Sequence, residues 1–70
     1  DHAEQLLLDL GFHQVRVRIH DKIARIEVMP DEFEKLLAAG DVVNKLKEEG
    51  FTYITMDLQG YQTGSMNEIL

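Results

Sequence analysis

The 70-residue sequence contains no cysteine, which excludes a disulfide framework, a thiolate zinc site and a cysteine nucleophile within these residues. It also lacks any apolar run that approaches the ~20 residues needed for a membrane-spanning helix. No secretory signal peptide is recognisable at its start. These absences predict a cytoplasmic protein that does not enter a membrane.

Positive charge is scarce as well. Seven Lys and Arg residues stand against 13 Asp and Glu, so the formal net charge is −6. Such an excess of negative charge argues against non-specific nucleic-acid binding and against docking on an anionic membrane. All three arginines nevertheless fall between positions 16 and 25, and we infer that something negative binds there.

The pattern of apolar residues predicts one small α+β domain. Helical spacing indicates helices at 1–10, from Asp31 up to Gly40 and from Asp41 up to Gly50, and alternation indicates strands at 13–20, 23–29 and 51–58. The expected inner face of the third strand consists of Ile54, Met56 and Leu58. This order of elements predicts a two-layer sandwich, with a three-stranded, mainly antiparallel sheet and helices on one face, which is a partial ferredoxin-like fold.

The expected topology leaves a sheet edge open. A right-handed return from the second strand would place the third strand beside the first, in the order 2-1-3. An open edge is a site of unwanted pairing unless something covers it. We therefore expect the chain to self-associate, or to be one domain, residues 1–70, of a longer protein that covers the edge.

The first two expected strands form a hairpin around Asp21-Lys22. In the simplest register their apolar residues coincide on one face, Val17 with Ile26 and Ile19 with Ala24. The polar face then carries Arg16 opposite Glu27 and Arg18 opposite Arg25. Two facing arginines repel each other until an anion lies between them.

The arginine face is the main candidate for a binding site. Guanidinium groups bind phosphate or carboxylate through paired hydrogen bonds, and Arg16 and Arg18, two apart on a strand, point at the same place. Arg25 adds a third group. Because Glu27 would partly neutralise Arg16, we expect Arg18 to contribute more to binding. The alternative is a solvated strand face with an Arg16–Glu27 ion pair.

Three further features are auxiliary candidates. His20, on the same face, would bind an anion or transfer a proton, unless it is an ordinary exposed turn residue. Glu27 and Asp57 would hold Mg2+ if their strands were adjacent, and ion pairs with the arginines are the alternative. Ser65 begins an S-x-x-E capping box, whose backbone N–H groups would bind an anion or merely cap a helix. No P-loop, GxGxxG, HExxH or Ser/His/Asp set is present.

Three stretches resemble the C-terminal part of the LarE family: RVRIHDKIARIEVMPDEF, VVNKLKEEGFTYITMDLQGY and GSMNEIL. The similarity extends from about Leu6 to Leu70. LarE-type proteins are PP-loop ATP pyrophosphatases that act as sacrificial sulfur transferases in nickel-pincer cofactor biosynthesis. The resemblance implies ATP and Mg2+ as cofactors of the full-length enzyme and a pyridinium mononucleotide as its phosphate-bearing substrate. It also places Arg16 and Arg18 at the substrate phosphate.

The resemblance also defines what these residues would not do. The family's Ser-Gly-Gly motif and its sulfur source, a cysteine or a cysteine-held iron–sulfur cluster, are absent here. The chain would therefore need no cofactor of its own and would not be catalytic alone. Its implied partners are an N-terminal PP-loop domain of the same protein or further copies in a homo-oligomer. The alternative is a stand-alone, non-catalytic module that binds a small anion or self-associates.

Overall fold

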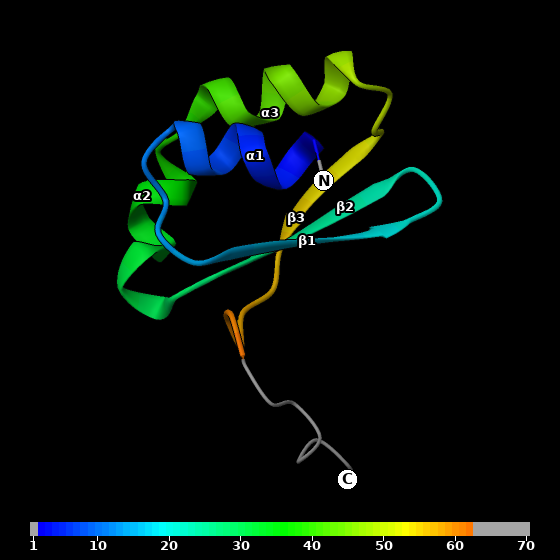
Figure 1. Ribbon diagram of the computed structural model, residues 1–70. Helices are drawn as coiled ribbons and strands as arrows, with labels where there is room; N and C mark the ends of the chain where they lie inside the picture. The colour runs from blue at the N-terminus through cyan, green and yellow to red at the C-terminus, as the bar shows by residue number, and fades with distance from the viewer. Residues whose placement is uncertain (1, 63–70) are drawn as a thin grey trace, which may run out of the picture.

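Three helices lie on one face of a three-stranded sheet in the computed structural model, which describes residues 2–62 (Figure 1). The elements are α1 (His2–Asp9), β1 (Val15–His20), β2 (Ile23–Val28), the 3-10 turn η1 (Pro30–Glu32), α2 (Phe33–Leu37), α3 (Gly40–Glu48) and β3 (Tyr53–Met56). The predicted two-layer α+β fold is confirmed. The helix predicted to begin at Ser65 lies outside the described residues. Within residues 2–62, no helix has the length and apolarity required to cross a membrane.

The hairpin of β1 and β2 has the predicted register. Arg16 lies opposite Glu27 and Arg18 lies opposite Arg25, and the apolar pairs coincide as expected. The turn between the strands is tight because Asp21 adopts a φ of 54°, in the left-handed region that aspartate tolerates better than most residues. Strict alternation therefore places the arginines on the face that the helices do not cover.

The predicted strand order, 2-1-3, is wrong. β3 pairs in parallel with β2, so the order is β1-β2-β3 and the sheet is mixed. On the outer edge of β1, the carboxylate of Glu4 on α1 accepts the backbone N–H of Val17 at 3.0 Å and so occupies one donor of that edge. β2, most of whose residues are buried, is the central strand, and α2 and α3 form the crossover to β3.

The core lies between the sheet and the helices. Its buried apolar residues are Ala3, Leu7, Phe12, Val15, Val17, Ala24, Ile26, Val28, Leu36, Val42 and Leu46. Ile54 and Met56 pack against this core, as predicted. Leu58 does not, and it is 79% exposed. The reason is that β3 ends at Met56 and the chain then turns, with the side chain of Asp57 accepting the backbone N–H of Gln59 at 2.8 Å.

The chain after β3, Asp57–Gln62, forms a return segment across the end of β2. Its backbone is attached by the N–H of Tyr61, which donates to the carbonyl of Val28 at 2.8 Å. Gly60 has a φ of 81°, and a Cβ at this position would lie 2.9 Å from the same carbonyl oxygen. Only glycine fits here without displacement. The return segment is thus held close to the arginine-bearing strands.

Candidate functional site

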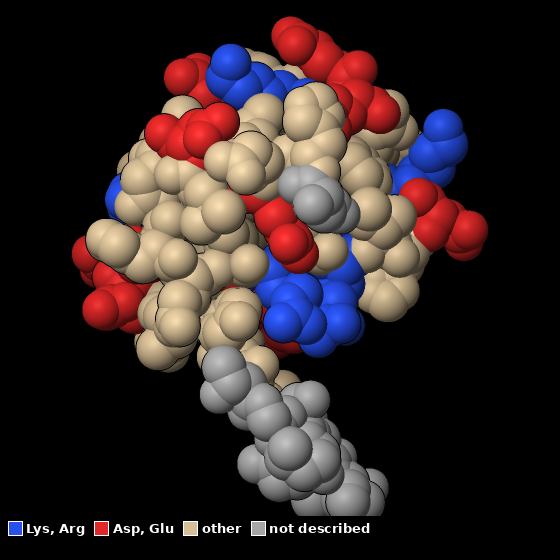
Figure 2. Space-filling view, viewed as in Figure 1, with Lys and Arg blue, Asp and Glu red and all other residues tan. Residues whose placement is uncertain are grey.

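The open face of the sheet carries the three arginines. Arg16 and Arg18 come from β1 and Arg25 comes from β2, and strand alternation points all of them away from the helices. Figure 2 shows the largest cluster of Lys and Arg side chains on the lower side of the molecule, where Figure 1 has the uncovered face of the sheet, and smaller groups at the edges of the view. The rest of this view is largely acidic or uncharged.

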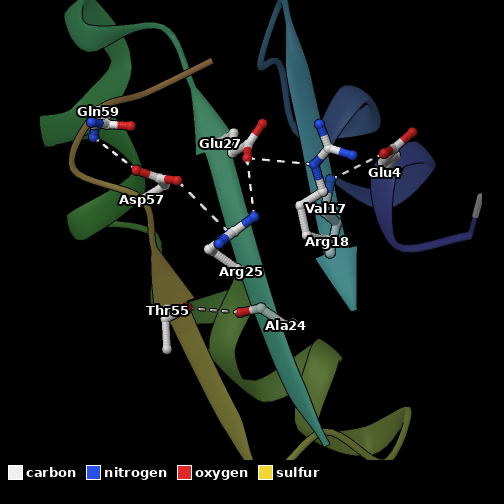
Figure 3. Close-up of polar contacts among 9 residues, drawn as sticks. All are labelled: Glu4, Val17, Arg18, Ala24, Arg25, Glu27, Thr55, Asp57 and Gln59. Atoms are coloured by element: carbon white, nitrogen blue, oxygen red, sulfur yellow. Dashed lines mark hydrogen bonds and ion pairs between the residues drawn. The ribbon is translucent and has the colours of Figure 1, made fainter. Parts of the chain in front are cut away.

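Glu27 lies between the two facing arginines (Figure 3). Its Oε2 atom is 3.5 Å from Nε of Arg18 and 3.7 Å from Nη2 of Arg25, and its side chain is only 10% exposed. The repulsion between the arginines is therefore relieved by a carboxylate of the protein itself. Glu27 forms these ion pairs rather than the alternative pair with Arg16, so the premise that Glu27 neutralises Arg16 is wrong.

Asp57 extends this network on the other side of Arg25 (Figure 3). Its Oδ2 atom lies 3.8 Å from Nε of Arg25, which is an ion pair but is too long for a hydrogen bond. The Nε atom is buried and finds no hydrogen-bond acceptor in the part of the chain that the structure describes. Glu27 lies on β2 and Asp57 directly follows the neighbouring strand β3, but the two carboxylates flank a guanidinium. No group of three or more metal-ligating side chains occurs within residues 2–62.

Arg16 has a different environment from the other two arginines. Its Cζ atom lies 5.7 Å from the ring centroid of Tyr61, a cation–π contact supplied by the return segment. Among residues 2–62 it forms no ion pair, whereas Arg18 and Arg25 do. A guanidinium that rests on a ring keeps the N–H donors in its plane available. Arg16 is therefore the arginine best placed to bind an external anion.

A polar hollow lies between the hairpin and the return segment. It has a volume of about 230 Å3 and is lined by Arg18, Arg25, Glu27, Asp57, Gln59, Gly60 and Gln62. The charges of this lining balance, because two guanidinium groups face two carboxylates. The excess positive charge of the open face thus comes from Arg16, which does not line the polar hollow but lies opposite Glu27, one of its lining residues, in the hairpin.

The remaining predicted site residues are not brought into this network. His20 is exposed at the end of β1, and no hydrogen bond or ion pair joins its side chain to another residue in the described range 2–62. Its auxiliary role stays a prediction. Ser65 lies outside the described residues.

Sequence reasoning missed the return segment as part of the site. Tyr61 supports Arg16, and Gln59 and Gln62 line the polar hollow. The available signal was the Gln-Gly-Tyr-Gln stretch that directly follows the last strand, since a glycine there permits a close return over the sheet. Nothing in the spacing indicated that this return reaches β1.

A second charged cluster lies away from the open face. The buried carboxylate of Glu32 accepts the backbone N–H of His13 at 3.2 Å, contacts His13 Nδ1 at 2.9 Å and lies 3.9 Å from Nζ of Lys35. Burial alone would raise the pKa of Glu32. The hydrogen bonds from the side chain and backbone of His13, together with the charges of His13 and Lys35, outweigh burial and hold the pKa below its usual 4.5.

This second cluster joins separate elements rather than forming a hollow. The ammonium of Lys35 also donates to the carbonyl of Gly11 at 2.7 Å and lies 4.7 Å from the ring centroid of Phe12. Glu32 and Lys35 thereby attach the α1–β1 connection to η1 and α2. We assign this cluster a structural role.

The known proteins that this chain is similar to are longer than the chain itself. No protein-family model matches it. It is 41% identical over 71 residues to an uncharacterized protein of Synechocystis sp. and 46% identical over 69 residues to pyridinium-3,5-bisthiocarboxylic acid mononucleotide synthase of Lactiplantibacillus plantarum, in each case over 97% of this chain. The chain spans about a quarter of the length of these relatives, 26% and 25% respectively. The resemblance to LarE predicted from the sequence is confirmed by the second relative.

Proposed function

We propose that this chain, similar to LarE-type proteins over nearly its whole length, is the domain of an ATP-dependent sulfur transferase that binds the phosphate of a pyridinium mononucleotide. The observation that carries the proposal is the guanidinium of Arg16, which lies over the ring of Tyr61 and forms no ion pair within residues 2–62, beside the residues that line a polar hollow. The name of the L. plantarum relative describes a synthase of a mononucleotide, a product with a phosphate group. We therefore take the anion that Arg16 binds to be the phosphate group of a mononucleotide.

The arrangement of the arginines supports phosphate in particular. Arg16 and Arg18 project from one strand face about 6.6 Å apart along the chain, so two oxygens of one phosphate reach both groups. Arg25 supports Arg18 indirectly, because both contact Glu27. Charge-assisted hydrogen bonds contribute roughly 1.5–3 kcal/mol each. After the cost of association, an affinity in the millimolar range is expected for phosphate alone.

The remaining steps of the reaction belong to other parts of a longer protein. In this proposal residues 1–70 form one domain, and a PP-loop domain elsewhere binds ATP and Mg2+ and carries out activation and sulfur transfer. The present residues then hold and orient the substrate by its phosphate, in the cytoplasm. The sulfur donor also lies outside these residues, which contain no cysteine.

The open edge of β3 supports a second role in assembly. An apolar hollow of about 180 Å3 lies beside this edge, between β3 and the crossover helices, and Leu37 in its lining is 73% exposed. Another domain of the longer protein or a second copy would cover this edge. A stand-alone module that binds small anions and self-associates is the alternative function, and it would use the same two surfaces.

A phosphate titration followed by backbone NMR tests the binding proposal. We expect shifts on the hairpin and the return segment, with Arg16→Ala weakening binding more than Arg18→Ala, because Arg18 already shares Glu27. This order is the reverse of the expectation from sequence. Lys45→Ala on α3 removes an equal charge far from the site and should bind phosphate as the wild type does. If phosphate shifts no residue of the hairpin, the proposal fails.

A comparison of ligands separates the two functions. A domain of a mononucleotide-processing enzyme should bind a pyridine mononucleotide more tightly than inorganic phosphate. A module for small anions should show no such preference. Sedimentation at several concentrations then tests the open edge, since a strictly monomeric and stable chain would contradict self-association.

A further inference from the structure

We propose that the polar hollow binds the hydroxyl groups of a pentose whose phosphate is held by Arg16 and Arg18. This inference rests on the proposed function, because it requires a phosphate at the arginines. It assigns a sugar subsite to Asp57, Gln59 and Gln62. From the sequence, only Asp57 of these three was a candidate site residue, and then for Mg2+.

The charge balance of the polar hollow favours a neutral, hydroxyl-bearing ligand. Arg18 and Arg25 face Glu27 and Asp57 there, so a second anion would gain little attraction and would meet two carboxylates. Sugar hydroxyls both donate and accept hydrogen bonds. The carboxylates accept from them, and the guanidinium groups and side-chain amides donate to them. Carboxylate–ribose pairing is a common means of sugar recognition in proteins.

The hydrogen-bonding capacity of the lining is not used up. Asp57 receives the backbone N–H of Gln59 on Oδ1, whereas its Oδ2 atom reaches only Nε of Arg25, at 3.8 Å. That Nε atom is buried without an acceptor in the described part of the chain, and a buried donor left unsatisfied is costly. A hydroxyl in the hollow would accept a hydrogen bond from the exposed guanidinium of Arg18 and donate to Oδ2 of Asp57, and the buried Nε atom of Arg25 would gain an acceptor only if its guanidinium shifted.

The size and position of the polar hollow suit one sugar ring. Its volume of about 230 Å3 corresponds to roughly eight water molecules at ~30 Å3 each. Arg18 lines the hollow and shares a strand face with Arg16, so the phosphate position and the hollow are contiguous. A sugar joined to the phosphate by one ester bond therefore reaches the carboxylates without a gap.

Titrations of the chain with inorganic phosphate, ribose 5-phosphate and 2-deoxyribose 5-phosphate test this inference by NMR. We expect ribose 5-phosphate to bind about tenfold more tightly than phosphate, which corresponds to one or two additional hydrogen bonds to charged groups. The 2-deoxy sugar, with one hydroxyl fewer, should bind with intermediate affinity. Shifts that appear with the sugar phosphates but not with phosphate should map to Asp57–Gln62.

Matched variants separate a sugar contact from a general effect of charge. Asp57→Asn keeps the oxygen that accepts the turn N–H but removes the negative charge, and it should abolish most of the tenfold gain while phosphate binding is unchanged or slightly tighter. Asp41→Asn, on the exposed surface of α3, makes the same charge change and should keep the gain. Gln59→Ala leaves the ion pairs intact and should reduce the affinity gain of ribose 5-phosphate over phosphate by about threefold. This variant still tests the sugar subsite if Asp57→Asn fails to fold.

The possible outcomes distinguish the two proposals. If phosphate binds at the arginines but ribose 5-phosphate binds no more tightly, the sugar subsite is wrong and the phosphate site stands. If neither ligand shifts the hairpin, both are wrong. If Asp57→Asn and Asp41→Asn change the affinity for the sugar phosphate equally, the carboxylate of Asp57 acts only through its charge, and the inference is overturned.

Discussion

Two buried glutamates, Glu27 and Glu32, are each surrounded by positive charge, and yet their environments differ in kind. Both are 8% exposed. Glu32 is held by contacts of 2.9 and 3.2 Å to His13, whereas the contacts of Glu27 to Arg18 and Arg25 are 3.5 and 3.7 Å. The short hydrogen bonds of Glu32 hold neighbouring elements in place. The longer ion pairs of Glu27 lie beside a hollow, where the side chains can rearrange around a ligand. The difference distinguishes a structural cluster from a candidate binding site.

The largest expected effect is a loss of stability when the carboxylate of Glu32 is removed. Glu32→Ala leaves His13 and Lys35 without their common partner and should lower the free energy of unfolding by about 2–3 kcal/mol. Urea unfolding measures this directly. Glu34→Ala, an exposed acid on α2, is the control and should change stability by less than about 0.5 kcal/mol. Equal losses in the two variants would show that the contacts of Glu32 contribute no more than a surface charge.

Acid should act on the same cluster. The pKa of Glu32 lies below 4.5 in the folded protein, so the unfolded chain takes up a proton at a higher pH than the folded one does. The stabilisation is therefore complete above pH 4.5 and is lost as the pH falls through the lower, folded-state pKa. Unfolding experiments across this range should show a shallower loss of stability in Glu32→Gln than in the wild type. Parallel curves would contradict the assignment.

Glu27 should behave differently, because it competes with the anion. Glu27→Gln removes the negative charge between Arg18 and Arg25, and we expect phosphate to bind roughly two- to fivefold more tightly. Glu32→Gln should leave phosphate affinity unchanged. The measurement is the same NMR titration for both variants. An unchanged or weaker affinity in Glu27→Gln would mean that Glu27 orders the arginines for binding rather than competing for them.

An effect of similar size is expected from the residue that supports Arg16. Tyr61→Leu removes the ring beneath the guanidinium and should weaken phosphate binding about two- to fivefold, the equivalent of an exposed cation–π contact. Tyr61→Phe retains a ring and should bind phosphate like the wild type. In the Arg16→Ala background the Tyr61→Leu change should have no further effect. A further loss in that background would place the role of Tyr61 elsewhere.

Local patterns were sufficient to predict the hairpin but not the position of its neighbour. The register of Arg18 opposite Arg25 follows from alternation within a few residues. The strand order places β3 beside β2 instead, and on the outer side of β1 the carboxylate of Glu4 accepts the N–H of Val17. Because Glu4 lies thirteen positions before Val17, the alternation of residues within the strand gives no sign of this contact.

The sequence was sufficient to predict which residues form the candidate site, but not which of its arginines form ion pairs with Glu27. Sequence placed the three arginines and Glu27 on one face, as the structure does. Which arginine has no ion pair within residues 2–62 depends on side-chain directions, since Glu27 turns diagonally to Arg18 rather than across to Arg16. It depends also on Tyr61, which comes from a distant part of the chain. Contacts of this kind are set by tertiary packing and not by spacing.

The carboxylate of Glu4 has a consequence for how this domain can be built into larger structures. Because it occupies a backbone donor on the outer side of β1, that side offers a poor template for a foreign strand, as protected sheet edges in natural proteins do. Among the described residues 2–62, β3 is the edge strand with no such side-chain contact to a backbone donor, so it is the easier side for a sheet to extend. The arginine-bearing hairpin then stays at the margin of a larger sheet.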